Sequence, residues 1–202
     1  MTTVGLRHPP AFAIWVTGLP ASGKSTLVRA LRTALEDRGI QIVVLESDAL
    51  REILTPEPRY DEQERDFFYG QMAGIGALLV DQRVSVVFDA TANRRSYRYK
   101  ARSKIPRFLE VYVDSPLAVC VSRDPKGIYR KGREGESDTV PGVQAAYEPP
   151  GNPEVIVHGD REASEAAAQR VIAKLIEKCY IQVAPLNSLE VTTPGAPEPN
   201  NS

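Results

Sequence analysis

Residues 13–25 read AIWVTGLPASGKS, and this stretch is the strongest indication of the fold. Its second part, residues 18–25, matches the pattern G-x-x-x-x-G-K-[ST]. The match follows a short apolar run and precedes Leu27, Leu31 and Leu35, which share one face of a helix. A strand, a glycine-containing loop and a helix in this order are the context in which backbone N–H groups surround a phosphate. We therefore expect residues 18–25, the phosphate loop, to bind a nucleotide.

Each part of the phosphate loop has a chemical role. Gly18 and Gly23 allow backbone angles and a close approach that a side chain would block, so successive N–H groups can face an anion. The helix that begins near Lys24 adds its positive end. Lys24 supplies a charge to the β- and γ-phosphates, and the Ser25 hydroxyl can ligate Mg²⁺. A strand-to-helix turn with a solvated lysine is the alternative. The residues assigned to ATP are Gly18, Leu19, Pro20, Ala21, Ser22, Gly23, Lys24, Ser25 and Thr26.

Short apolar runs alternate with helical spacing along the rest of the chain. The runs that predict strands are residues 11–16, 40–45, 84–88, 108–113 and 155–157. The segments that predict helices are residues 24–38, 61–82, 94–104, 117–122 and 162–178. Alternating strands and helices are typical of a parallel sheet, because each crossover helix packs on one of its faces. We therefore expect an α/β fold, with a five-stranded parallel sheet and helices on both faces.

Composition and charge exclude several classes of protein. The 202 residues suffice for one domain, and 25 Lys and Arg against 26 Asp and Glu give no basic field for nucleic acid or membranes. No run of about 18 apolar residues occurs, and the first ten residues lack the apolar core of a signal peptide. Cys120 and Cys179 are far apart, which disfavours a disulfide framework or a zinc site and favours the cytoplasm.

We expect a domain at 11–181, a flexible N-terminus at 1–10 and a disordered tail at 182–202.

The segment 124–153, which we name the lid, has no apolar period. A structureless loop of about thirty residues inside one domain is usually functional, and a closing lid would exclude the water that hydrolyses ATP. Basic residues at and inside it are Arg123, Lys126, Arg130, Lys131 and Arg133. Such cations suit the charge of phosphoryl transfer, although a solvated basic stretch is the alternative. We expect a mobile lid, with Arg123 on the nucleotide and Lys126 on the substrate.

Two carboxylates follow neighbouring strands. Asp48 comes after the second strand and Asp89 ends the third, at the strand ends where open α/β sheets bind ligands. Either one can hold a water of the Mg²⁺ shell or accept a proton from an attacking hydroxyl. The alternatives are helix caps, with Asp48 ahead of residues 49–54 and Asp89 ahead of the next helix. Ser25, Asp48 and Asp89 are the candidate metal ligands.

From about residue 14 to residue 154, the chain resembles the adenylylsulfate (APS) kinases. The resemblance rests on residues 14–19 (IWVTGL), 47–51 (SDALR) and 123–129 (RDPKGIY), and continues through YEPP at 147–150 to NPE at 152–154. It implies a P-loop kinase fold and, commonly, a homodimer. It also implies transfer of the γ-phosphate of MgATP to the 3′-hydroxyl of APS, giving 3′-phosphoadenylyl sulfate.

The resemblance also implies roles for single residues. It makes Lys24 a catalytic residue and Asp48 the carboxylate beside the acceptor hydroxyl. Arg51 and Arg65 fall where the family has arginines that hold APS. What is implied is a sulfate-activating kinase with ATP and Mg²⁺ as cofactors and adenylyl sulfate as its small-molecule partner.

The acceptor side departs from the family pattern. Where the family has Asp-Gly-Asp-Asn, this chain has ESDA at 46–49, and where the family has an asparagine, this chain has Phe68. The family's Ser-Pro pair is replaced by ANR at 92–94, and its Phe-Thr-Gly by VPG at 140–142. The positions most affected are Glu46, Ala49, Phe68, Asn93 and Val140. Another nucleotide-linked or small-molecule hydroxyl is therefore an alternative acceptor.

A nucleotide switch or a nucleic-acid-binding ATPase is an alternative from a different class. A guanine switch should carry Asn-Lys-x-Asp, and the chain has no such tetrad. A nucleic-acid groove would have to be local, and its candidate residues are Arg94, Arg95, Arg98, Lys100 and Arg102.

Overall fold

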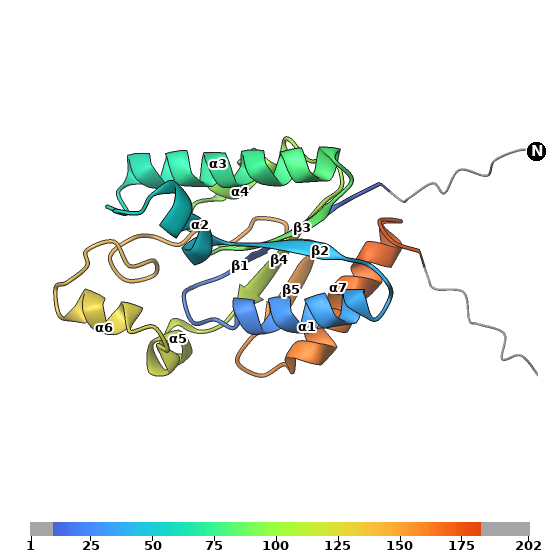
Figure 1. Cartoon of the computed structure of the whole chain (residues 1–202). Helices are drawn as coiled ribbons and strands as arrows, with labels where there is room; N and C mark the ends of the chain where they lie inside the picture. Colours follow the sequence, from blue (N-terminus) through green and yellow to red (C-terminus); the bar gives the residue numbers. More distant parts are fainter. Residues whose placement is uncertain (1–9, 183–202) are drawn as a thin grey trace, which may run out of the picture.

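The computed structural model describes residues 10–182. Its strands, shown in Figure 1, are β1 (Ala13–Thr17), β2 (Ile42–Glu46), β3 (Ser85–Asp89), β4 (Phe108–Asp114) and β5 (Val155–His158). Its helices are α1 (Lys24–Glu36), α2 (Ser47–Leu54), α3 (Glu62–Asp81), α4 (Arg95–Arg102), α5 (Leu117–Arg123), α6 (Ile128–Arg133) and α7 (Ser164–Glu177). The predicted flexible N-terminus (1–10) and disordered tail (182–202) lie outside the described residues, except for the innermost residue of each.

The five strands form one parallel sheet in the order β2-β3-β1-β4-β5. The expected α/β fold with a five-stranded parallel sheet is confirmed, and the predicted strand ends differ by at most two residues. β1 lies in the middle, paired with β3 on one side and β4 on the other. The strand order therefore reverses beside β1, and ligands of open α/β sheets bind in the crevice at such a point. The phosphate loop leaves β1 at this crevice.

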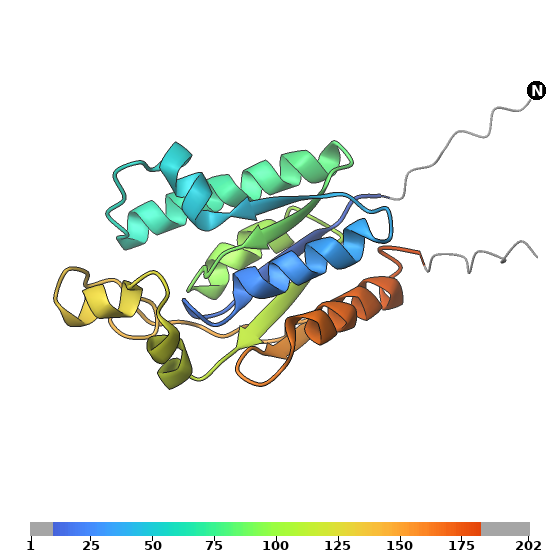
Figure 2. The same cartoon turned by 60° about the horizontal axis from the view of Figure 1, so that its bottom comes forward.

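Helices cover both faces of the sheet. In Figures 1 and 2, α1 and α7 lie side by side on one face, and α3 and α4 lie on the other. Alternate residues of β1 face opposite layers: Ile14 and Val16 belong to the core under α1 and α7, whereas Ala13 and Trp15 belong to the core under α3 and α4. All five residues of β1 are buried, as expected of a parallel strand covered on both faces.

Aromatic packing holds the end of β3 in place. Trp15 stacks on Phe88 with ring centroids 4.5 Å apart, and the indole N–H of Trp15 donates to the carbonyl of Ala90 at 3.2 Å. The hydroxyl of Tyr69 in α3 accepts a hydrogen bond from the backbone N–H of Ala92 at 3.1 Å. The loop that follows β3 is thereby fixed next to the phosphate loop.

A glycine of α3 makes this packing possible. A Cβ at Gly76 would lie 2.1 Å from the ring of Phe88, which is fully buried and cannot move aside. We expect Gly76→Ala to lower the free energy of unfolding, because overpacking costs about 1 to 3 kcal/mol and outweighs a helix-propensity gain of about 1 kcal/mol. Gly74→Ala, in the same helix with open space around it, should stabilise the protein by about 0.5 to 1 kcal/mol. Urea denaturation of both variants measures the difference, and equal midpoints would contradict it.

The lid contains more structure than its sequence indicates. The expectation of a structureless segment over 124–153 is wrong in part, because α6 lies inside it. Tyr129 and Val140 are buried against Cys120 of α5, and the hydroxyl of Tyr129 donates to the carbonyl of Pro20 at 3.0 Å. These partners are distant in the sequence, and a six-residue helix is too short to show an apolar period. The mobility of the lid stays a prediction.

Candidate active site

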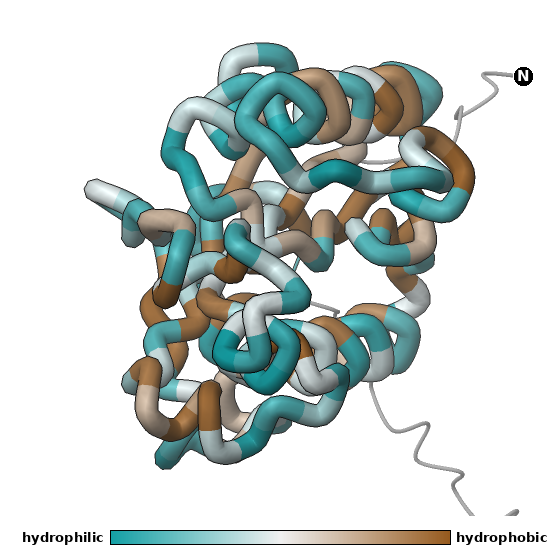
Figure 3. Tube along the Cα trace, turned by 90° about the vertical axis from the view of Figure 1, so that its left-hand side faces the viewer, coloured by the Kyte–Doolittle hydropathy of each residue, from teal (hydrophilic) through white to brown (hydrophobic). Residues whose placement is uncertain are grey.

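A cleft of about 490 Å³ lies where the strands end. It is lined by parts of the phosphate loop and α1, the β2–α2 junction, the end of β3, the start of the lid, and the segment after β5. Figure 3 views this end of the molecule, where hydrophilic segments are prominent. Of the predicted site residues, the lining contains Pro20, Ala21, Gly23, Lys24, Ser25, Thr26, Asp48, Asp89, Arg123 and Lys126.

The phosphate loop has the backbone geometry that an anion site needs. Gly18 and Gly23 have φ values of 157° and 108°, and a Cβ at Gly18 would lie 2.5 Å from the carbonyl oxygen of Val113. Only glycine fits at Gly18, because the neighbouring strand approaches so closely. Gly23 is the N-cap of α1 and provides no side-chain cap. The first N–H groups of α1 are therefore left for a ligand.

Lys24 points into the cleft and has no carboxylate partner within 4.0 Å among residues 10–182. Its ammonium donates to the carbonyl of Leu19 at 2.9 Å. Burial lowers the pKa of Lys24, and the negative charge of Asp89 opposes the shift. A partly buried cation held only by a neutral carbonyl gains free energy when an anion arrives. Lys24 is thus arranged to bind phosphate oxygens.

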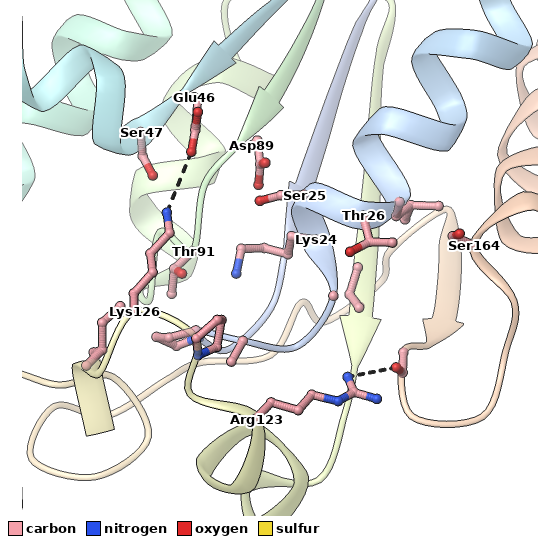
Figure 4. A pocket seen from close by; sticks show the side chains of 18 of the residues that line it. Lys24, Ser25, Thr26, Glu46, Ser47, Asp89, Thr91, Arg123, Lys126 and Ser164 are labelled. Atoms are coloured by element: carbon pink, nitrogen blue, oxygen red, sulfur yellow. Dashed lines mark hydrogen bonds and ion pairs between the residues drawn. The ribbon is translucent and has the colours of Figure 1, made fainter. Parts of the chain in front are cut away.

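Asp89 and Ser25 face each other across the cleft floor, as Figure 4 shows. Asp89 is only 5% exposed, and burial raises its pKa, while a hydrogen bond with Ser25 and the charge of Lys24 oppose the rise. No group of three or more His, Cys, Asp or Glu residues among residues 10–182 could enclose a metal by itself. Mg²⁺ needs no such cage, because it binds through one or two protein oxygens together with waters and substrate phosphates. The hydroxyl of Ser25 and the carboxylate of Asp89 fit this requirement.

Asp48 comes two residues after Glu46, which pairs with Asp89 in the sheet, and it lies within reach of the lid. It belongs to the first turn of α2, and its side chain is 58% exposed. The ammonium of Lys126 lies 2.5 Å from the carboxylate of Asp48 and 3.7 Å from that of Glu46, and Figure 4 shows Lys126 reaching toward Glu46. The hydrogen bond with Asp48 raises the pKa of Lys126. The lid therefore contributes a cation directly to the cleft.

The helix-cap alternatives for the two carboxylates are wrong. The N-cap of α2 is Glu46 and the N-cap of α4 is Arg94, and neither makes a side-chain capping bond. Asp48 and Asp89 therefore face the cleft rather than the ends of these helices.

The far end of the cleft contains residues that the sequence did not point to. Arg123 donates to the carbonyl of Gly159 at 2.9 Å. Val157 of β5 and three residues that follow this strand complete the wall: Gly159, Glu162 and Ser164. A Cβ at Gly159 would lie 2.2 Å from the carbonyl oxygen of Ser22. A glycine directly after the last strand is the one local signal that could have indicated this contact.

Arg51 and Arg65 do not line the cleft. Both are 7% exposed. Arg51 forms an ion pair with Glu64 and lies 4.0 Å from the ring centre of Phe68. Arg65 donates to three neutral oxygens on Tyr60, Asn93 and Thr139. Their assignment to the acceptor stays a prediction.

The candidate nucleic-acid groove is largely neutralised. Arg94 pairs with Glu62, Arg98 with Glu110, Lys100 with Asp66, and Arg102 with Glu110 and Glu154. The guanidinium of Arg95 donates to the carbonyl of Pro149. Paired cations have little charge left for a phosphate backbone, so this alternative loses its support. Within residues 10–182, none of the helices has the length and apolar character needed to cross a bilayer.

Comparison with known proteins agrees with this geometry. Residues 10–158 match the family model described as Adenylylsulphate kinase. The adenylyl-sulfate kinase of Microcystis aeruginosa is 39% identical over 85% of this chain and 94% of the relative, and that of Halothermothrix orenii is 35% identical over 88% and 96%.

Solved structures give the same result. The structure of the Mycobacterium tuberculosis APS kinase CysC, in complex with AMPPNP and APS, superposes with a TM-score of 0.78 at 32% identity and covers 83% of this chain and 99% of that one. A shikimate kinase from Acinetobacter baumannii, with a TM-score of 0.56 at 14% identity, shares the fold alone. From its sequence match over most of its length and the superposition of its fold, the chain belongs to the adenylylsulphate kinase family.

Proposed function

We propose that this protein transfers the γ-phosphate of MgATP to the 3′-hydroxyl of adenylyl sulfate, giving 3′-phosphoadenylyl sulfate. The observation that carries the proposal is the meeting of Lys24, Ser25, Asp48, Asp89 and Lys126 in one cleft at the end of β1. Phosphoryl transfer is catalysed mainly by positioning and by neutralising charge. This cleft offers cations for the phosphates and an exposed carboxylate for the hydroxyl.

In the proposed mechanism, the phosphate loop binds ATP through the N–H groups at the start of α1. Lys24 exchanges its bond with Leu19 for the β- and γ-phosphates. Mg²⁺, held by Ser25 and Asp89, would neutralise phosphate charge when bound. Asp48 orients the acceptor hydroxyl and takes its proton. Lys126, which lies beside Asp48, would then add its charge to the transferring group.

The acceptor side of the proposal depends on α2 and α3. Arg51 is three residues after Asp48 in α2, and Arg65 belongs to α3, which packs against α2. They would face the sulfate-bearing end of the acceptor, whereas Arg123 would lie at the nucleoside end of ATP. The family resemblance adds a homodimer to the proposal, which analytical ultracentrifugation can test.

An ATP-consumption assay with and without APS tests the proposed function. We expect ADP to form quickly only when APS is present, together with one equivalent of 3′-phosphoadenylyl sulfate. The departures at Glu46, Ala49, Phe68, Asn93 and Val140 make a panel of other nucleotide-linked and small-molecule hydroxyl compounds the necessary comparison. ADP formation stimulated by one of these compounds and not by APS would contradict the proposal.

A further inference from the structure

Two departures from the family pattern contact the two buried arginines, and a third directly follows a residue that does. The ring of Phe68 lies 4.0 Å from the guanidinium of Arg51. The side-chain oxygen of Asn93 accepts from Arg65 at 2.9 Å. The third departure, at Val140, follows Thr139, whose carbonyl accepts from Arg65 at 2.7 Å. The residues that set this chain apart from the family therefore surround the groups expected to hold the acceptor.

The two arginines differ in their charge balance. Arg51 has a carboxylate partner, Glu64, and the two side chains are 8% and 9% exposed. Arg65 is equally buried, yet no carboxylate among residues 10–182 pairs with it. Its partners are the carbonyls of Tyr60 and Thr139 and the amide oxygen of Asn93. These three bonds use three of the five N–H donors of a guanidinium, so a buried, uncompensated positive charge remains.

Asn93 also fixes the chain that lies over Arg65. We name residues 139–148 the strap. The side-chain amide of Asn93 donates to the carbonyl of Ala146 at 2.8 Å, and its backbone carbonyl accepts from the amide of Glu148 at 2.7 Å. Asn93 is 5% exposed. One buried side chain thus joins α3, the loop after β3 and the strap.

This cluster is adjacent to the reaction site. The strap residue Tyr147 lies 3.1 Å, hydroxyl to hydroxyl, from Thr17 at the end of β1. Thr17 in turn donates to the carbonyl of Thr91 at 2.6 Å. Thr91 lines the cleft together with Asp48 and Asp89, and it precedes Asn93 by two residues. Arg65 is therefore linked, through Asn93, to the loop that lines the cleft.

We propose that Asn93 is a specificity-determining positioning residue: it fixes Arg65 with a neutral oxygen and so leaves the charge of the guanidinium for an anionic group of the acceptor. A carboxylate in the same place would hold Arg65 equally well but would neutralise it. The inference rests on the proposed function, because it concerns the acceptor of the same site.

Two substitutions separate charge from packing. Asn93→Asp retains the size of the side chain and an oxygen for Arg65, but adds a negative charge. Asn93→Ala removes the bonds to Arg65 and Ala146 without adding charge. Both variants lose the donor to the strap. Asn93→Ala also loses the oxygen that accepts from Arg65, whereas only Asn93→Asp adds a negative charge, so a larger effect of Asn93→Asp cannot come from lost contacts. Gln82→Glu makes the same amide-to-carboxylate change at an exposed position and serves as the matched control.

Binding of APS to the full chain, with MgADP in the nucleotide site, is measured by calorimetry, since no turnover can occur. We expect the Kd for APS to rise at least about tenfold in Asn93→Asp relative to wild type, and less in Asn93→Ala. The Kd for MgADP should stay within about twofold of wild type in both Asn93 variants. In Gln82→Glu, the Kd for APS and the Kd for MgADP should both stay within this range. Equal effects of the two Asn93 variants, or an equal loss of nucleotide affinity, would mean that Asn93 has only a structural role and would overturn the inference.

Inorganic sulfate distinguishes failure of this inference from failure of the proposed function. If wild type neither binds nor phosphorylates APS, the proposed function is wrong. The inference then still predicts that sulfate raises the Tm of the MgADP complex more in wild type than in Asn93→Asp, and equal shifts would overturn it. If wild type phosphorylates APS and Asn93→Asp binds it equally well, the proposed function holds and the inference is wrong.

Discussion

Lys24→Ala is expected to lower kcat for APS-dependent ADP formation about 10³-fold or more, since charge neutralisation provides much of the catalysis of phosphoryl transfer. The side chain makes a single hydrogen bond, to the carbonyl of Leu19, so its removal should cost the fold only about 1 kcal/mol. Steady-state kinetics and circular dichroism of the purified variant measure the two effects.

The matched control for this variant is Lys104→Ala, which removes an exposed lysine outside the cleft. It should retain wild-type rates within about twofold. A Lys24→Ala enzyme that is folded and as active as Lys104→Ala would contradict the assignment of the phosphate loop.

Asp48→Asn is expected to lower kcat by about 10² to 10⁴-fold, the range of general-base catalysis, with little change in the Kd for nucleotide. The carboxylate is exposed in the cleft wall and contacts the lid lysine Lys126, and in the proposed mechanism it acts on the acceptor hydroxyl rather than on the nucleotide phosphates. Asp89→Asn should instead weaken MgATP binding, because Asp89 lies beside Ser25 and Lys24. Kinetics over a range of Mg²⁺ concentrations distinguish the two, since higher Mg²⁺ should restore only Asp89→Asn. Restoration of Asp48→Asn by Mg²⁺ would reverse the two roles.

The Asp89→Asn substitution is also expected to change the thermal stability of the protein. Burial raises the pKa of Asp89 in the folded chain, so its charged form is disfavoured by folding and costs stability at neutral pH. Asp89→Asn should therefore raise the Tm of the ligand-free protein at pH 7. The wild type gains stability as the pH falls through the raised pKa, so the advantage of the variant should disappear in acid. An advantage that persists in acid would contradict the assigned pKa shift.

Much of the fold could be predicted from local patterns. Short apolar runs of three to six residues, bounded by turn or charged residues, indicated all five strands, because strand formation depends on side-chain period and branching. The phosphate loop could be found because Gly18 and Gly23 must adopt backbone angles that other residues avoid. Asp48 and Asp89 could be found because parallel strands end at one edge of a sheet, and both line the cleft there.

The rest of the site depends on contacts between distant residues. The packing of Tyr129 against Pro20 and the closeness of Gly159 to Ser22 join segments more than a hundred residues apart. The hydrophobic periodicity of the sequence does not indicate which distant residues are in contact.

The sheet, the phosphate loop and the candidate carboxylates could be read from period, glycine conformation and strand ends, which are local properties of the chain. Which arginine has a carboxylate beside it depends on packing between distant segments. Arg51 and Arg65 have the same residue type and the same burial, yet one has a carboxylate partner and the other has only neutral oxygens. The difference arises because the loop after β3 and the strap pack against Arg65, whereas Glu64 lies beside Arg51. The energy of a charged side chain depends on the groups that lie around it in space.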